Sequence, residues 1–118
     1  MLLGHLVADY TLQGWLADVK QKSWWEEIIT KKHGFLVNMT KYKHDYIAAL
    51  FCHALYWSIL ICAPFFASSW FLVAVVLNTV AHAIIDDLKA NRLKLNLIQD
   101  QLLHLGQILL TLGIMMAI

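Results

Sequence analysis

Residues 67–87 read ASSWFLVAVVLNTVAHAIIDD, and this stretch decides the fold class. Up to Ile85 it contains no Asp, Glu, Lys or Arg. It is therefore apolar and long enough for a helix that crosses a hydrocarbon core of about 30 Å, which takes about 20 residues. The polar residues Asn78, His82 and Asp86 recur at every fourth position. Residues spaced i, i+4 share one face of a helix, so the stretch predicts a membrane helix with one polar stripe.

Three further stretches have a similar character. Residues 46–66 and 101–118 also lack Asp, Glu, Lys and Arg, and residues 1–17 are largely apolar without the basic start of a signal peptide. The chain is 60% hydrophobic and 14% charged, against about half and about a quarter in soluble domains. We therefore predict one all-α integral membrane domain over residues 1–118, a bundle of about four helices. These helices are expected at about 2–20, 45–66, 69–89 and 96–118.

The basic residues predict the orientation of this bundle. All nine Lys and Arg residues lie either between the first and second predicted helices or between the third and fourth. Cytoplasmic connections of membrane proteins carry an excess of Lys and Arg, so both connections are expected in the cytoplasm and both termini outside an inner membrane. The net charge of +1 gives no indication of a nucleic-acid partner.

The first basic connection contains a predicted interfacial segment at about 23–42. Ser23 and Glu26 have the spacing of a helix-capping box. Trp24 and Trp25 beside charged residues are typical of a short amphipathic helix at the level of the lipid headgroups.

Histidines and carboxylates inside the apolar stretches predict a metal site. His82 and Asp86 are spaced i, i+4, and two more His–carboxylate pairs share this spacing. An ionised Asp at the centre of a membrane helix costs roughly 2.5–3.5 kcal/mol, so such residues need partners and by default mark a functional site. A bound divalent cation supplies such a partner. The predicted ligands are His5, Asp9, His53, His82, Asp86, Asp100 and His104.

The types of ligand limit the metal. Imidazole with carboxylate suits zinc first, then manganese or iron, rather than magnesium or calcium, which prefer oxygen ligands alone. Seven candidates exceed the needs of one tetrahedral ion, so the surplus predicts either two ions or carboxylates that orient ligand histidines. The predicted supporting residues are Gln13, Lys20, Asn78 and Gln101.

Four short motifs in order resemble a known family. They are HLVADYTLQ at residues 5–13 followed by Lys20, HAL at 53–55, HAIID at 82–86 and DQLLH at 100–104. They look like the successive motifs of domain-of-unknown-function family 3307, small integral membrane proteins of bacteria and their phages. The resemblance implies a multi-helix membrane protein in which these polar positions are functional, and it implies no activity. Members often have a second His shortly after the position of His53, where this chain has Trp57.

Three functions are consistent with these patterns. The first is a metal-dependent hydrolase that acts on a membrane-associated ester or phosphoester, with Asp9, Asp86 and Asp100 as the catalytic candidates. The second is a non-enzymatic oligomer, a proton or ion pathway or a phage membrane effector, in which the same side chains relay protons. The third is a structural anchor in the membrane. A chain of this size has little surface with which to enclose a site, so a homo-oligomer is expected, with the bilayer and a lipid-linked substrate as partners.

Overall fold

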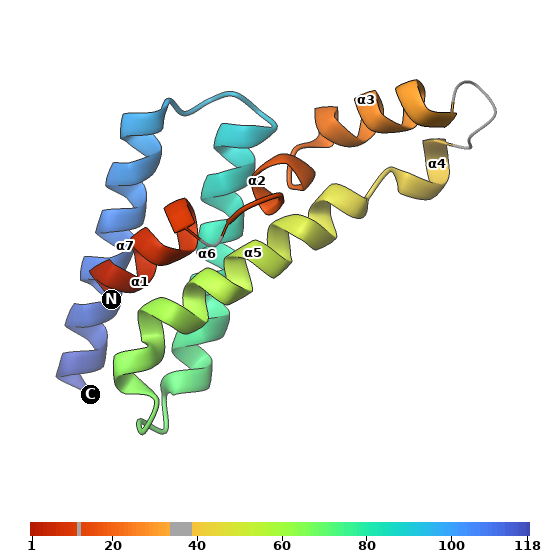
Figure 1. Ribbon diagram of the computed structural model, residues 1–118. Helices are drawn as coiled ribbons and strands as arrows, with labels where there is room; N and C mark the ends of the chain where they lie inside the picture. Colours follow the sequence, from red (N-terminus) through yellow and green to blue (C-terminus); the bar gives the residue numbers. More distant parts are fainter. Residues whose placement is uncertain (12, 34–38) are drawn as a thin grey trace.

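Every regular element in the described part of the chain is a helix (Figure 1). The computed structural model describes residues 1–11, 13–33 and 39–118, and only the backbone of residues 29, 30, 32, 33, 39 and 40. The predicted all-α class is confirmed. Within these described ranges, three helices are long and apolar enough to cross a membrane.

These three helices are α5 (Asp45–Cys62), α6 (Phe71–Ala90) and α7 (Leu97–Ala117), and they coincide with the predicted ranges 45–66, 69–89 and 96–118. Large apolar side chains on their outer faces are exposed, including Leu72 and Leu110. A face of this kind is stable against lipid but would aggregate in water. The three helices are therefore the candidate membrane spans of the described residues.

A tight turn joins α5 to α6 as an antiparallel hairpin. Pro64 lies in a 3₁₀ turn, Ala63–Phe65, which ends α5. Proline lacks the N–H that a continuing helix needs, so the chain turns at this point. The Ser68 hydroxyl then accepts a hydrogen bond of 3.2 Å from the N–H of Trp70, just before α6 begins.

A capping box starts α7. The Asn96 side chain accepts from the N–H of Gln99 (2.9 Å), and the Gln99 side chain accepts from the N–H of Asn96 (3.1 Å). These bonds satisfy backbone groups that the first turn of a helix leaves unpaired. They fix the register of α7 and hence the position of Asp100 in its first turn.

The first predicted helix, 2–20, needs correction. The structure has a short helix α1 (Leu2–Leu6), a π-helical turn (Val7–Thr11) and a separate helix α2 (Leu16–Val19). Gly14 adopts a φ of 48°, which a continuous right-handed helix does not contain and which glycine tolerates. Residues 2–11 extend about 15 Å at 1.5 Å per residue, about half the core thickness, so this segment is too short to cross a membrane.

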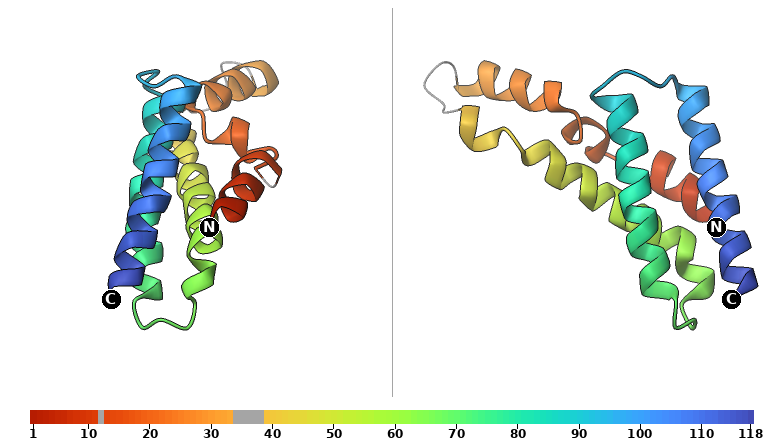
Figure 2. Two further views of the ribbon diagram at one scale, coloured as in Figure 1. Left: turned by 90° about the vertical axis from the view of Figure 1, so that its left-hand side faces the viewer. Right: turned by 180° about the vertical axis from the view of Figure 1, so that it is seen from behind.

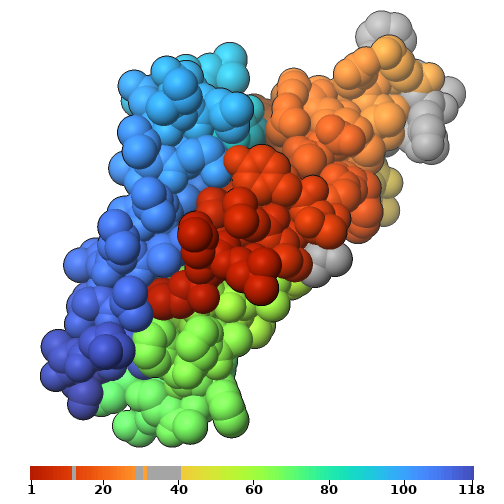
Figure 3. All heavy atoms as spheres, turned by 60° about the vertical axis from the view of Figure 1, so that its left-hand side comes forward, coloured from red at the N-terminus to blue at the C-terminus, as the bar shows by residue number. Residues whose placement is uncertain are grey.

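The N-terminal segment lies against the three spanning helices. Figure 2 shows α1 beside α5 and α7, and Figure 3 shows the segment covering the surface between these helices. Gly4 makes this close contact possible, because a Cβ atom at this position would be 2.7 Å from the Leu60 carbonyl oxygen of α5. The N-terminus, predicted on the same non-cytoplasmic side as the C-terminus, lies part-way between the two ends of the molecule (Figure 1).

Both basic connections lie at one end of the bundle, and the C-terminus lies at the other (Figure 1). The predicted interfacial segment 23–42 contains α3 (Lys22–His33) and α4 (Met39–Tyr42), with residues 34–38 outside the described part. Ser23 lies within the first turn of α3 instead of capping it. The Asn91 side chain satisfies this helix start, because it accepts from the N–H of Lys22 (2.8 Å) and donates to the carbonyl of Lys20 (3.2 Å).

Candidate metal centre

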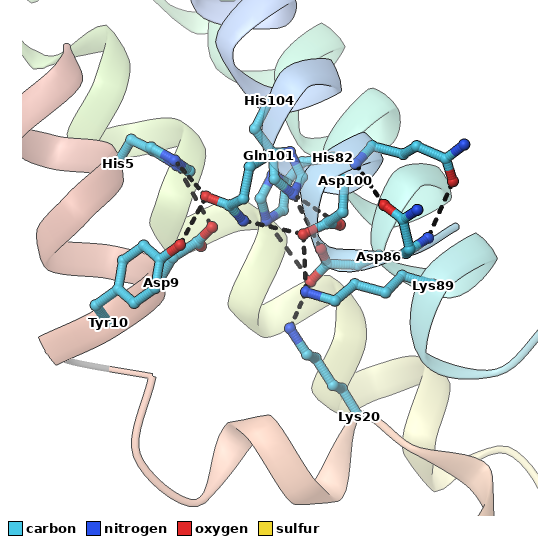
Figure 4. A network of polar contacts seen from close by, with 12 residues as sticks. His5, Asp9, Tyr10, Lys20, His82, Asp86, Lys89, Asp100, Gln101 and His104 are labelled. Atoms are coloured by element: carbon cyan, nitrogen blue, oxygen red, sulfur yellow. Dashed lines mark hydrogen bonds and ion pairs between the residues drawn. The ribbon is translucent and has the colours of Figure 1, made fainter. Parts of the chain in front are cut away.

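The predicted ligands converge from four separate elements. Figure 4 shows those from the N-terminal segment, α6 and α7. The π-helical turn contributes Asp9, α5 contributes His53, α6 contributes one i, i+4 pair and α7 contributes the other. All of these side chains are buried except Asp9, whose side chain is 10% exposed. Helix periodicity directs both members of each pair inward, and helix packing brings the pairs together. The pairs are His82 with Asp86 and Asp100 with His104.

Three ligand atoms lie at separations that suit one metal ion. The His53 Nε2 atom is 3.2 Å from the His82 Nε2 atom and 3.4 Å from the Asp86 Oδ2 atom. The His82 Nε2 atom is 3.7 Å from the same Asp86 oxygen. Ligands bonded at 2.0–2.1 Å around a tetrahedral zinc ion are about 3.3 Å apart. An ion can therefore bind all three atoms with small adjustments of the side chains.

Asp86 connects this triangle to α7. Its second oxygen, Oδ1, is 3.3 Å from the His104 Nε2 atom, which is also 3.3 Å from the Asp100 Oδ1 atom. His82, Asp86 and His104 form a second group of suitable size for an ion, and Asp9, His53 and His82 form a third. His82 and the carboxylate of Asp86 are thus central to the cluster, with Asp9 and His104 on either side.

Several buried atoms in this cluster have no hydrogen-bond partner among the described residues. They include the Asp9 Oδ1 and Asp100 Oδ1 atoms and both ring nitrogens of His104. Native proteins pair nearly all buried polar atoms, because an unpaired one costs about 1–3 kcal/mol. A cation among these oxygens and nitrogens would satisfy several of them at once, so the donor set fits a bound metal.

His5, also predicted as a ligand, has a different position. Its Nδ1 atom accepts a hydrogen bond of 2.9 Å from the indole of Trp57, and its Nε2 atom is 3.2 Å from the Gln101 Oε1 atom. Both ring nitrogens are thus paired with protein groups. The His5 Nδ1 atom also lies 3.4 Å from the Asp9 Oδ2 atom, so His5 packs beside that carboxylate.

Trp57 is a site residue that was not among the residues predicted from the sequence. Its ring stacks on His82 with centroids 4.1 Å apart, and His82 in turn stacks on His104 at 4.2 Å. Trp57 lies one helical turn after His53, so it faces the same side of α5. The spacing of His53 and Trp57 is the feature of the sequence that indicates a position at the site.

Two lysines neutralise part of the negative charge. The Lys20 ammonium is 2.7 Å from the Asp86 Oδ2 atom, and the Lys89 ammonium is 2.8 Å from the Asp100 Oδ2 atom. Lys20 was predicted as a supporting residue, whereas Lys89 was assigned only to a basic connection. With Asp9, three carboxylates face two ammonium groups, so the site has one excess negative charge when the imidazoles are neutral.

The other predicted supporting residues divide into two groups. Gln101 accepts from the Tyr10 hydroxyl (2.9 Å) and donates to Asp100 (3.0 Å), which places it at the site. Gln13, in the amide orientation that satisfies its neighbours, donates to the Asp9 carbonyl (2.8 Å) and accepts from Lys20.

Asn78 belongs to the second group, because its contacts lie away from the metal ligands. Its side-chain oxygen accepts from Gln107 (2.8 Å) and Thr111 (3.0 Å) of α7. Bonds of this type between membrane helices stabilise their packing. Asn78 therefore joins α6 to α7 one helical turn from His82.

Asp9 lies outside the three spanning helices. Burial disfavours its charged form, but the contact with His53 and the nearby His82 and His104 outweigh burial and hold the pKa of Asp9 below its usual range. An ionised Asp9 is the form that a metal binds.

A cavity of about 230 Å³ lies over the ligands. It adjoins a second cavity of about 320 Å³, and Gln13, Lys20, Asp86 and Lys89 line both. The buried carboxylates are therefore accessible to a small molecule from the end of the bundle that carries the basic connections.

Comparison of the chain with protein-family models, with curated proteins and with solved structures finds no match in any of the three. The resemblance to family 3307 remains a prediction, so the function is argued from the site.

Proposed function

We propose that this chain is a membrane-embedded, metal-dependent hydrolase that cleaves an ester or phosphoester of a membrane-associated substrate. The observation that carries the proposal is the cluster of His53, His82 and Asp86 at separations suited to one ion, with Asp86 also lining a cavity. Buried sites with convergent polar groups next to a cavity are the usual places for binding and catalysis.

The protein groups have separable roles in this proposal. His53, His82 and Asp86 would hold the ion. Asp9 groups with His53 and His82, and His104 groups with His82 and Asp86, so each would be a further ligand candidate. Nitrogen and carboxylate ligands favour zinc, with manganese or iron next. When bound, the ion supplies a Lewis acid that activates water and polarises the substrate.

Hydrolysis then requires two proton movements. A bond forms from the water oxygen to the acyl carbon or the phosphorus, and the bond from that atom to the ester oxygen breaks. A water proton passes to a carboxylate, for which Asp9 and Asp100 each offer an oxygen without a hydrogen-bond partner in the described structure. The departing oxygen takes up a proton, and the products are an acid and an alcohol.

The arrangement favours a local site over a proton pathway. The imidazoles and carboxylates contact one another at 3.2–3.7 Å as one cluster. A proton pathway needs such groups in succession along the membrane normal. A single cluster with a cavity on one side suits binding and chemistry at that side.

Orientation follows from the basic connections. We place the cavity and both connections at the cytoplasmic face, because Lys and Arg are enriched there. The bilayer delivers a lipid-borne substrate to this level. A site at the headgroup level accordingly suits an ester or phosphoester of a lipid.

Metal analysis of the purified protein tests the proposal. We expect about one zinc or manganese ion per chain. The variants His53→Asn and His82→Asn should each weaken metal binding by at least about tenfold. The matched control is His44→Asn, since His44 is exposed at the start of α5.

Activity is measured in the same preparations on micellar carboxyl esters and phosphoesters. Hydrolysis should follow metal content, be lost with a chelator and return with zinc or manganese. Absence of stoichiometric metal, or proton flux through proteoliposomes that survives chelation, would contradict the proposal and favour the pathway.

A further inference from the structure

Lys20 and Lys89 line the cavity but have no part in holding the ion. They come from different elements, since Lys20 caps the end of α2 and Lys89 lies in the last turn of α6. The Lys20 side chain is 13% exposed and the Lys89 side chain 37% exposed. Figure 4 shows both ammonium groups directed toward the carboxylates. Two cations that converge on one small cavity are a recognition feature for an anion.

The charge of the site depends on the metal. With neutral imidazoles, three carboxylates and two ammonium groups leave one excess negative charge, which repels an anion. A divalent cation reverses this to one excess positive charge. The ion also shares the Asp86 Oδ2 atom that Lys20 now contacts, so the ammonium becomes less strongly held by its carboxylate. An anion is therefore expected to bind only to the metal-loaded protein.

The remaining lining groups suit a phosphoryl group. Gln13 and Gln101 line the same cavity, and each amide has a second N–H besides the one that its protein partner accepts. A phosphate accepts several hydrogen bonds and binds lysine as a point charge. A volume of about 230 Å³ has room for a phosphoryl group and part of its ester, but not for an acyl chain.

The rim of the cavities is apolar. Leu97 is 59% exposed and Leu93 83% exposed, and both line the cavities at the basic end of the molecule. Apolar side chains around a cationic site at headgroup level fit a phosphate attached to a hydrocarbon chain.

We propose that Lys20 and Lys89 bind the phosphoryl group of the substrate above the metal, which makes the substrate a phosphoester. This inference rests on the proposed function, because the positive charge of the cavity requires the ion. Free phosphate and a lipid-borne phosphoryl group share this chemistry, and the apolar rim favours the lipid-borne form.

The test uses the full chain in detergent, loaded with Mn²⁺. The phosphorus NMR relaxation of two probes is measured: inorganic phosphate, and hexylphosphonate, whose carbon–phosphorus bond resists hydrolysis. A phosphorus atom next to Mn²⁺ relaxes much faster, so saturation of this effect gives an affinity. Electron paramagnetic resonance measures the bound Mn²⁺ separately.

We expect saturable relaxation of both probes, with hexylphosphonate bound at least about tenfold more tightly because its chain packs on the rim. The variant K20Q/K89Q should keep its Mn²⁺ and lose about tenfold or more in phosphonate affinity, as expected for removal of charge-assisted hydrogen bonds. K94Q is the matched control, because Lys94 is exposed and lines neither cavity. K20R/K89R, which retains both charges, should recover most of the binding.

The outcomes are distinct. Bound Mn²⁺ without saturable relaxation, or equal affinities in K20Q/K89Q and K94Q, overturns the inference and leaves the metal site intact. Tighter binding of inorganic phosphate than of hexylphosphonate overturns the lipid-borne source. Failure of the wild-type protein to bind Mn²⁺ overturns the proposed function and the inference with it. If K20Q/K89Q loses Mn²⁺ through misfolding, K89Q alone decides, because Lys89 is the more exposed of the two.

Discussion

Trp57 is the largest fully buried side chain in the described part of the chain, and its ring contacts the imidazoles of His5, His82 and His104. Its indole N–H donates to His5, and its ring face supports His82. A single residue of α5 thus fixes two imidazoles from other helices. Rigid support of this kind determines where ligand atoms meet.

Trp57→Phe separates these two contributions. The variant keeps an aromatic ring beside His82 but leaves the His5 Nδ1 atom without its donor, at a cost of about 1–3 kcal/mol in unfolding free energy. Trp57→Ala also opens a cavity and should cost about 3–5 kcal/mol. Unfolding of the detergent-solubilised protein measures both. Trp70→Phe, at an exposed position in the α5–α6 turn, is the control and should change stability by less than about 0.5 kcal/mol. Equal stability of Trp57→Phe and the control would contradict this role.

At this scale the sequence predicted what helix geometry alone determines. His82 with Asp86 and Asp100 with His104 face one direction because i and i+4 always do. The pairing of Lys89 with Asp100 depends instead on how α6 and α7 dock, which no local spacing contains. The hydrogen bond between His5 and Trp57 also depends on how the elements dock. Local spacing does not contain this bond, and for that reason His5 was predicted as a metal ligand.

At the scale of elements, the N-terminal segment differs most from a regular bundle. If residues 2–20 formed one continuous helix, the chain would keep a single direction past Asp9. The π-helical turn and the left-handed Gly14 instead let the segment enter beside α5 and return to the basic end. The apolar composition of residues 1–17 predicted one continuous helix, because composition does not report a reversal of the chain.

Gly4→Ala tests the docking of this segment. Its Cβ would lie 2.7 Å from a backbone oxygen of α5, so α1 must shift, at a cost of about 1–3 kcal/mol in unfolding free energy. The shift displaces Asp9, so metal affinity should also fall severalfold. In Gly106→Ala the new Cβ meets nothing within 4 Å, and this helical position should become more stable by up to about 1 kcal/mol. Metal titration and unfolding of both variants give the comparison, and unchanged values for Gly4→Ala would contradict the close packing of α1.

At the scale of the whole molecule, three spanning helices place the two basic connections on one side and the C-terminus on the other. Single cysteines at Lys43, Lys94 and Ile118, in a chain without Cys52 and Cys62, test this arrangement with a membrane-impermeant maleimide. In intact spheroplasts we expect labelling at position 118 alone. Positions 43 and 94 should react only after the membrane is opened. Labelling of positions 43 and 94 from opposite sides would contradict the topology.

The central claim is that imidazoles from α5 and α6 share one metal ion with Asp86. X-ray absorption at the zinc edge of the zinc-loaded protein measures this most directly. We predict a shell of nitrogen and oxygen ligands at about 2.0–2.1 Å with the multiple scattering of two or more imidazoles, lost in part in His53→Asn and His82→Asn. A shell that contains sulfur at about 2.3 Å, or one without imidazole scattering, would contradict the account.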